Sequence, residues 1–167
     1  MPTPTPSADD RFLISDLWAK YSWTLDTGDV EGFVECFAED AVFDELIVAT
    51  GRPEIRSLVT KFFYENPLFA GRQHLIGQHQ FFADSEGRPD HWRVRSFAHV
   101  FVLRDVGASL FWTGYYDDVV AKIGGEWLFL YRKASRWLGD VLVNFPENTI
   151  ARAELPIALT QALSARR

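Results

Sequence analysis

The sequence predicts an α+β fold in which about three N-terminal helices pack against a strongly curved antiparallel sheet and leave a pocket between the layers. Apolar residues recur at helical spacing in the first part of the chain, and four long runs rich in β-branched and aromatic residues follow. The connections between these runs are short, which favours antiparallel pairing. With 167 residues, 47% of them hydrophobic, the chain can build one well-buried core but not two full domains.

The helical part has recognisable start and stop signals. Gly28 can end a first amphipathic helix, and Pro53 can occupy the first turn of a third one, which Asn66-Pro67 would stop. In chain order we expect a helix from Asp9 to Gly28, a short helix over 30–38, a first strand at 41–43, and a helix from Pro53 to Asn66.

The four β-rich runs are joined by turn signals. Glu86-Gly87-Arg88-Pro89 is a turn signal between the first and second runs. Gly124-Gly125 suits a tight hairpin between the third and fourth. A last helix is expected over 154–165. We therefore expect a disordered tail over 1–9, one domain over 10–145, and a helical tail over 146–167 that covers the pocket or contacts another subunit. The expected strands cover 73–83, 91–103, 110–122 and 127–137.

Charge and cysteine content exclude several classes of partner. The formal net charge is −6, and the 17 Lys and Arg residues are scattered, so the sequence offers no nucleic-acid-binding patch. The N-terminus lacks the basic start and apolar run of a signal peptide or membrane anchor. Cys36 is the only cysteine, which fits a reduced thiol and a cytoplasmic location.

Two histidines are candidates for chemistry because of their position on the expected strands. The two-residue period of a strand puts His74 on one face with Ile76, and His99 on one face with Phe97, so either could help to wall a cavity. The same period puts His79 on the face opposite His74, where we expect it at the surface. On this pattern alone, such a histidine is more often structural than catalytic, and an aspartate such as Asp26 at a helix end is more often turn chemistry.

Three short segments connect these residues to a known family. Leu25-Asp26-Thr27-Gly28-Asp29, Arg72-Gln73-His74-Leu75-Ile76-Gly77 and Ile123-Gly124-Gly125-Glu126-Trp127 resemble the SnoaL-like branch of the NTF2-like superfamily, with scytalone dehydratase as the most similar named enzyme. The resemblance spans roughly residues 10–142 and implies an NTF2-like cone.

The resemblance also implies roles for individual residues. It makes Asp26 and His74 a catalytic acid/base dyad and His99 the second histidine of the site. The tyrosine that precedes the aspartate in scytalone dehydratase is Leu25 here, which implies a different substrate. Aromatic residues that could line the pocket or polarise a carbonyl are Tyr21, Phe43, Phe63, Phe97, Trp112, Tyr116 and Tyr131.

The resulting hypothesis is a cofactor-independent, dehydratase-like lyase that removes a carbon-bound proton from a small hydrophobic, ring-containing substrate. An isomerase or a polyketide cyclase would use the same dyad, while a hydrophobic-ligand binder or a scaffold similar to a dioxygenase β subunit would use the fold without chemistry. No glycine-rich nucleotide loop or metal-ligand spacing is present, so we expect no cofactor and no metal. By the same resemblance we expect a homo-oligomer, either a trimer or a dimer.

Overall fold

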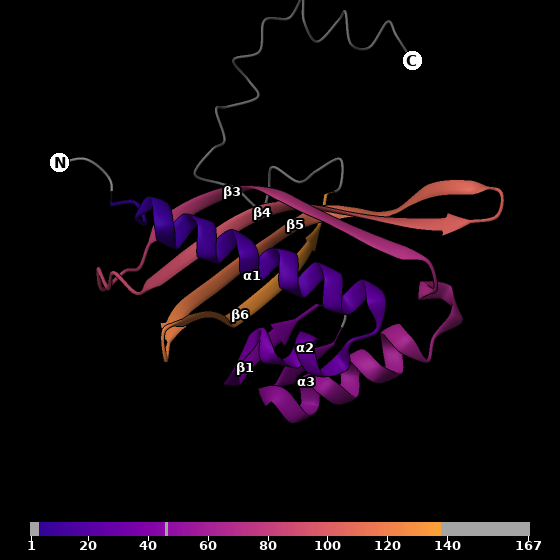
Figure 1. Cartoon of the computed structure of the whole chain (residues 1–167), viewed down its shortest axis with the longest axis horizontal. Helices are drawn as coiled ribbons and strands as arrows, with labels where there is room; N and C mark the ends of the chain where they lie inside the picture. Colours follow the sequence, from indigo (N-terminus) through magenta and orange to yellow (C-terminus); the bar gives the residue numbers. More distant parts are fainter. Residues whose placement is uncertain (1–3, 46, 138–167) are drawn as a thin grey trace, which may run out of the picture. The chain divides into compact units, whose positions relative to one another are not determined.

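The computed structural model describes residues 4–45 and 47–137. Backbone contacts divide the chain into one unit over Met1–Arg136 and another over Trp137–Arg167. All helices and strands given below belong to the first unit (Figure 1). The helix predicted over 154–165 lies outside the described residues.

The first helix, α1, spans Ala8–Thr27, so it begins inside the segment expected to be a disordered tail. The Ser7 side chain accepts a hydrogen bond from the backbone N–H of Asp10, which satisfies one of the free donors at the helix start. Gly28 ends the helix in the left-handed conformation, with φ of 85°, as the glycine signal predicted. This stop places Asp26 in the last turn of α1.

Short elements connect α1 to the main sheet. Helix α2 is shorter than expected, because strand β1 already begins one residue after Cys36. The third predicted helix is divided into an α-helical part and a π-helical turn, which Asn66 and Pro67 follow. The bounds are α2 Val30–Glu35, β1 Phe37–Asp44, β2 Val48–Thr50, α3 Gly51–Val59, the π-helix η1 Thr60–Tyr64 and the 3₁₀-helix η2 Pro67–Phe69.

The six strands form one sheet in the order β2-β1-β6-β5-β4-β3. The four long strands pair antiparallel, as the short connections predicted. Strand β1, however, pairs parallel with β6, so the sheet is mixed. No hairpin joins β1 to β6, so no short connection imposes antiparallel pairing on them. The long strands are β3 Arg72–Ala83, β4 His91–Arg104, β5 Gly107–Ile123 and β6 Glu126–Arg136.

Helix α1 covers one face of the long strands, while α2 and α3 lie beside β1 (Figure 1). Side chains at helical spacing on α1, among them Trp18 and Tyr21, are buried against the aromatic core that includes Phe129. We call the sheet face that α1 covers the inner face and the other the outer face. Position on one face or the other decides which predicted residues can share a site.

Candidate functional site

Asp26 and His74 are hydrogen-bonded to each other at two points. Oδ1 of Asp26 lies 2.6 Å from Nδ1 of the imidazole, and Oδ2 accepts the backbone N–H of His74, also at 2.6 Å. Both side chains are largely buried, with 14% of Asp26 and 5% of His74 exposed. A carboxylate bound to Nδ1 selects the tautomer that carries its proton on Nδ1, which leaves the lone pair on Nε2.

Arg72 supports the same carboxylate from the other side. Its Nε lies 3.6 Å from Oδ1 of Asp26, and its Nη2 donates to the carbonyl oxygen of Leu25. Nη1 donates to the carbonyl oxygens of Phe63 and Phe69 at 2.8 and 3.1 Å. The guanidinium therefore joins the last turn of α1 to the π-helix and the 3₁₀-helix.

Local sequence explains why these groups meet. Arg72 and His74 are two residues apart on β3, so both point to the inner face. Gly71, immediately before the strand, has a φ of 72°, and a side-chain carbon there would lie 2.5 Å from the carbonyl oxygen of Leu103. Glycine at this position lets β3 start close to β4, beside the end of α1.

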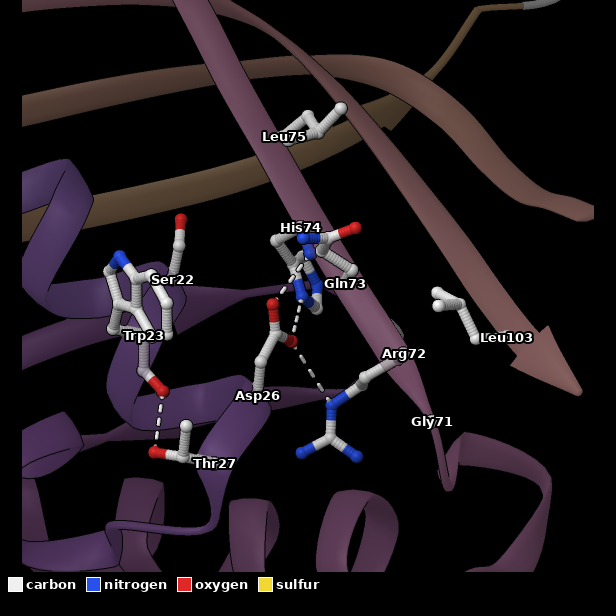
Figure 2. Close-up of a pocket in the computed structure, with 10 residues that line it drawn as sticks. All are labelled: Ser22, Trp23, Asp26, Thr27, Gly71, Arg72, Gln73, His74, Leu75 and Leu103. Atoms are coloured by element: carbon white, nitrogen blue, oxygen red, sulfur yellow. Dashed lines mark hydrogen bonds and ion pairs between the residues drawn. The ribbon is translucent and has the colours of Figure 1, made fainter. Parts of the chain in front are cut away.

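A pocket of about 460 Å³ opens beside this group, between the last turns of α1 and the start of β3. Figure 2 shows the Asp26 carboxylate pointing toward His74 and Arg72 on the strand. The indole of Trp23, which is 73% exposed, lines this pocket. Leu75 and Leu103 also line it from the outer face, so the pocket extends around the free edge of β3. The arrangement is an apolar pocket with a few converging polar groups, which is typical of small-molecule sites.

The structure does not bring His99 to this site, which corrects the predicted role of that residue. In the antiparallel register His74 is opposite Val100, whereas His99 is opposite Leu75. Directly opposite residues point to the same face, so His99 lies on the outer face. Its Nδ1 lies 2.9 Å from the hydroxyl oxygen of Thr113.

The predicted aromatic residues also divide between the two faces. Tyr116 and Trp112 lie on the inner face, with ring centroids 6.0 Å apart, and Tyr21 is completely buried there. Phe43 and Phe63 are buried in the core on the same side. Phe97 is 41% exposed on the outer face, and Tyr131 donates its hydroxyl to Asp44 there at 2.6 Å. Phe97 and Tyr131 were predicted to line the interior, but both lie outside it.

His79 is on the inner face, not at the surface as predicted. The pairing of β3 with β4 shifts between Gly77 and Gln80, and Gln78 has a φ of 55°. A bulge of this kind adds one residue and reverses the alternation of side chains beyond it. The imidazole of His79 lies 5.0 Å from the Trp18 ring and contacts the hydroxyl of Ser96 at 2.7 Å.

A second buried polar group was missed in the sequence because its members are far apart in the chain. Arg132 and Asp118 form a bidentate ion pair with two 3.0 Å contacts, and both side chains have no exposed surface. The guanidinium carbon lies 3.9 Å from the ring centroids of both Tyr21 and Tyr116. Glu45 completes the group, with Oε1 3.4 Å from the Tyr21 hydroxyl. Opposite charges on neighbouring strands are the signal that could have identified the pair.

Within the described residues, no group of three or more His, Cys, Asp or Glu side chains is arranged to hold a metal ion. No helix in the same part of the chain has both the length and the apolar character needed to cross a bilayer.

A family model described as SnoaL-like domain matches residues 6–133. No curated protein matches the chain. Among solved structures, Rv3472, a protein of unknown function from Mycobacterium tuberculosis solved as a variant, is 27% identical over 84% of this chain and 78% of its own, with a TM-score of 0.67. Two proteins from Novosphingobium aromaticivorans share the fold.

The first is an NTF2-like protein with a cystatin-like fold, at 20% identity over 82% of this chain and 88% of its own, with a TM-score of 0.70. The second, assigned as a scytalone dehydratase, is 23% identical over 77% of this chain and 85% of its own, with a TM-score of 0.62. These likenesses agree with the predicted α+β fold of NTF2-like type.

Proposed function

This chain belongs to the SnoaL-like domain family, and from that premise we propose that it is a cofactor-independent, dehydratase-like lyase with His74 as its general base. The family includes cyclases, dehydratases and isomerases, so an enzymatic role is in keeping with it. The observation that carries the proposal is the double hydrogen bond between Asp26 and His74, both at 2.6 Å.

The geometry favours proton abstraction at one nitrogen. Within residues 4–45 and 47–137, the hydrogen bonds of His74 use its backbone N–H and Nδ1, so Nε2 remains for a substrate. When Nε2 takes a proton, the imidazolium that forms is stabilised by the Asp26 carboxylate. Positioned proton transfer of this kind accelerates a reaction by roughly 10²- to 10⁴-fold.

The surroundings favour a hydrophobic, ring-containing substrate. Carbon acids are weak, so the proton must be acidified by a neighbouring carbonyl group, and the site must limit access of water. Trp23, Leu75 and Leu103 supply exposed apolar contact area in the pocket that Asp26 and His74 also line. A cyclic β-hydroxy ketone combines an acidified carbon with a hydroxyl that can leave.

A direct test uses 3-hydroxy-1-tetralone, a cyclic β-hydroxy ketone that becomes 1-naphthol when it loses water. The purified chain is expected to form 1-naphthol, detected by its fluorescence. His74→Gln and Asp26→Asn are expected to lower the rate by roughly 10²-fold or more. Asp44→Asn is the matched control, since Asp44 bonds Tyr131 on the outer face.

The same experiment separates the enzyme from a carrier of hydrophobic ligands. A carrier would bind the tetralone saturably, quench tryptophan fluorescence and leave the compound unchanged. Full turnover by both dyad variants would also reject the proposal. Equal loss of activity in Asp44→Asn would attribute the effect to folding, which thermal melting of all three variants would reveal.

A further inference from the structure

Three exposed apolar side chains converge on the pocket that Asp26 and His74 line. Trp23 is 73% exposed, Leu75 51% and Leu103 52%, and all three line that pocket. They come from three different elements, α1, β3 and β4, so the sequence does not group them. Single exposed apolar residues are common on soluble proteins, but several of them around a pocket with polar groups are typical of a ligand site.

Trp23 is the aromatic member of this group. All six tryptophans of the chain lie in the part that the structure describes, and Trp23 is the most exposed of them. Trp18, four residues or more before it on the same helix, packs its ring against His79 and Phe129. Among the described residues no such ring pair includes Trp23. Its indole is therefore available to a ring from outside the chain.

The indole and the proposed base lie in one pocket. Trp23 and Asp26 are three residues apart on α1, so their side chains share one side of the helix. Figure 2 shows the indole beside the Asp26–His74 pair, and all three residues line the same space of about 460 Å³. A pocket of this size admits a molecule of two fused rings. One ligand can therefore contact the indole and His74 together.

The apolar side chains of the pocket respond differently to flat and saturated rings. Leu75 and Leu103 gain from any apolar surface that they cover, so they do not distinguish the two kinds of ring. The π system of an indole also favours a stacked or edge-on aromatic ring. Such a pair contributes roughly 3- to 10-fold in affinity beyond the area that it buries.

We propose that Trp23 is the specificity-determining residue of this pocket and stacks on an aromatic ring of the substrate. This inference rests on the proposed function. It narrows the substrate class from ring-containing ketones to ketones whose reacting ring is fused to an aromatic ring. In such a molecule the aromatic ring lies against Trp23, and the neighbouring ring presents its acidified carbon to His74.

Two ketones with the same carbon skeleton separate stacking from apolar contact. In 1-tetralone an aromatic ring is fused to the ring that carries the ketone, whereas in trans-1-decalone both rings are saturated. Calorimetric titration gives the Kd of each ketone. Exchange of their C2 protons in D₂O gives the activity of the base, because neither ketone has a hydroxyl to lose.

Trp23→Leu removes the aromatic face and keeps an apolar side chain. We expect it to raise the Kd of 1-tetralone roughly 3- to 10-fold more than the Kd of trans-1-decalone, and to lower kcat/KM for exchange in the same proportion. Trp23→Phe should restore most of the preference. Phe12→Leu is the matched control, since Phe12 also lies on α1, is 71% exposed and does not line this pocket.

The outcomes separate this inference from the proposed function. With melting temperatures unchanged, an equal change in Kd for both ketones in Trp23→Leu, or no change in either, would overturn the stacking role and leave the base intact. The same loss of preference in Phe12→Leu would also overturn it. If the unmodified chain shows the preference but exchanges no C2 protons, the proposed base fails and the ring site stands. If it binds neither ketone, both proposals fail.

Discussion

The guanidinium of Arg72 lies 3.6 Å from the Asp26 carboxylate while donating hydrogen bonds to the backbone on both sides of it. Its side chain is only 5% exposed. Lysine cannot reproduce this planar set of donors, so Arg72→Lys leaves buried carbonyl oxygens without partners. We expect a loss of about 3 kcal/mol in the free energy of unfolding, measured by urea denaturation.

Arg104→Lys is the matched control for this substitution. Arg104 also donates to two backbone carbonyl oxygens, those of Ala70 and Leu68, but from an exposed position. Water can replace its donors, so the loss should stay below about 1 kcal/mol. Similar losses in the two variants would contradict the role given to Arg72.

The two adjacent aspartates of β5 should differ sharply in their effect on stability. Asp118 has no exposed surface and pairs with Arg132, while Asp117 pairs with Arg93 and Arg95 on the outer face. Asp118→Asn leaves a buried guanidinium without its counter-charge and should lower the free energy of unfolding by about 3–5 kcal/mol. Asp117→Asn should lower it by about 1 kcal/mol or less. Chemical denaturation measures both, and a larger effect at Asp117 would reject the placement.

The bulge at Gln78 predicts an unusual response to substitution. A residue other than glycine at φ of 55° costs about 1–2 kcal/mol, and a β-branched side chain fits there worst. Gln78→Gly should therefore be neutral or raise the free energy of unfolding slightly, while Gln78→Val should lower it. Thermal melting of the two variants checks this order, and a more stable valine variant would show that the strand has no bulge.

Regular alternation along the strands explains why only part of the site could be predicted from sequence. The period of two correctly placed His74 and Ile76 on one face, but it does not say which face of β4 is covered by helix. The pairing of His74 with Val100 decides that, and it sends His99 outward. His79 was misplaced because strict alternation ignores the bulge that follows Gly77, although an isolated glycine within a strand is a bulge signal.

The fold and the Asp26–His74 contact were easier to predict than the buried ion pair. Gly28 and the hairpin glycines are local signals, and they correctly placed the end of α1 and the last hairpin. The Asp26–His74 contact joins residues 48 positions apart, and only the resemblance to a known family connected them. No local signal indicated where the Glu45 side chain would point, because Glu45 follows the end of β1, where the alternation of a strand no longer applies.

The free energy of unfolding should decrease as pH rises, because of Glu45. Its pKa is raised in the folded chain to about 7 from an ordinary value of 4.5, so the folded state retains a proton that the unfolded state loses. This stabilisation is fully present below about pH 4.5 and is lost as pH rises through about 7. Its full size is at most about 3 kcal/mol, reduced because part of Glu45 stays accessible.

The comparison that checks this effect is the unmodified chain against Glu45→Gln, which has no titrating group at this position. The free energy of unfolding of both is measured in urea at pH 5 and pH 8. Relative to Glu45→Gln, the unmodified chain should be less stable at pH 8 than at pH 5. An unchanged difference would mean that Glu45 ionises as freely in the folded chain as in water.

The tautomer of His74 is the most direct test of the proposed base. In ¹⁵N-resolved NMR spectra of the neutral imidazole, we expect the proton on Nδ1, bonded to Asp26, and a bare Nε2. Asp26→Asn should weaken or reverse this preference. A proton found on Nε2 in the unmodified chain, with Nδ1 bare, would contradict the proposal that Nε2 removes the proton from carbon.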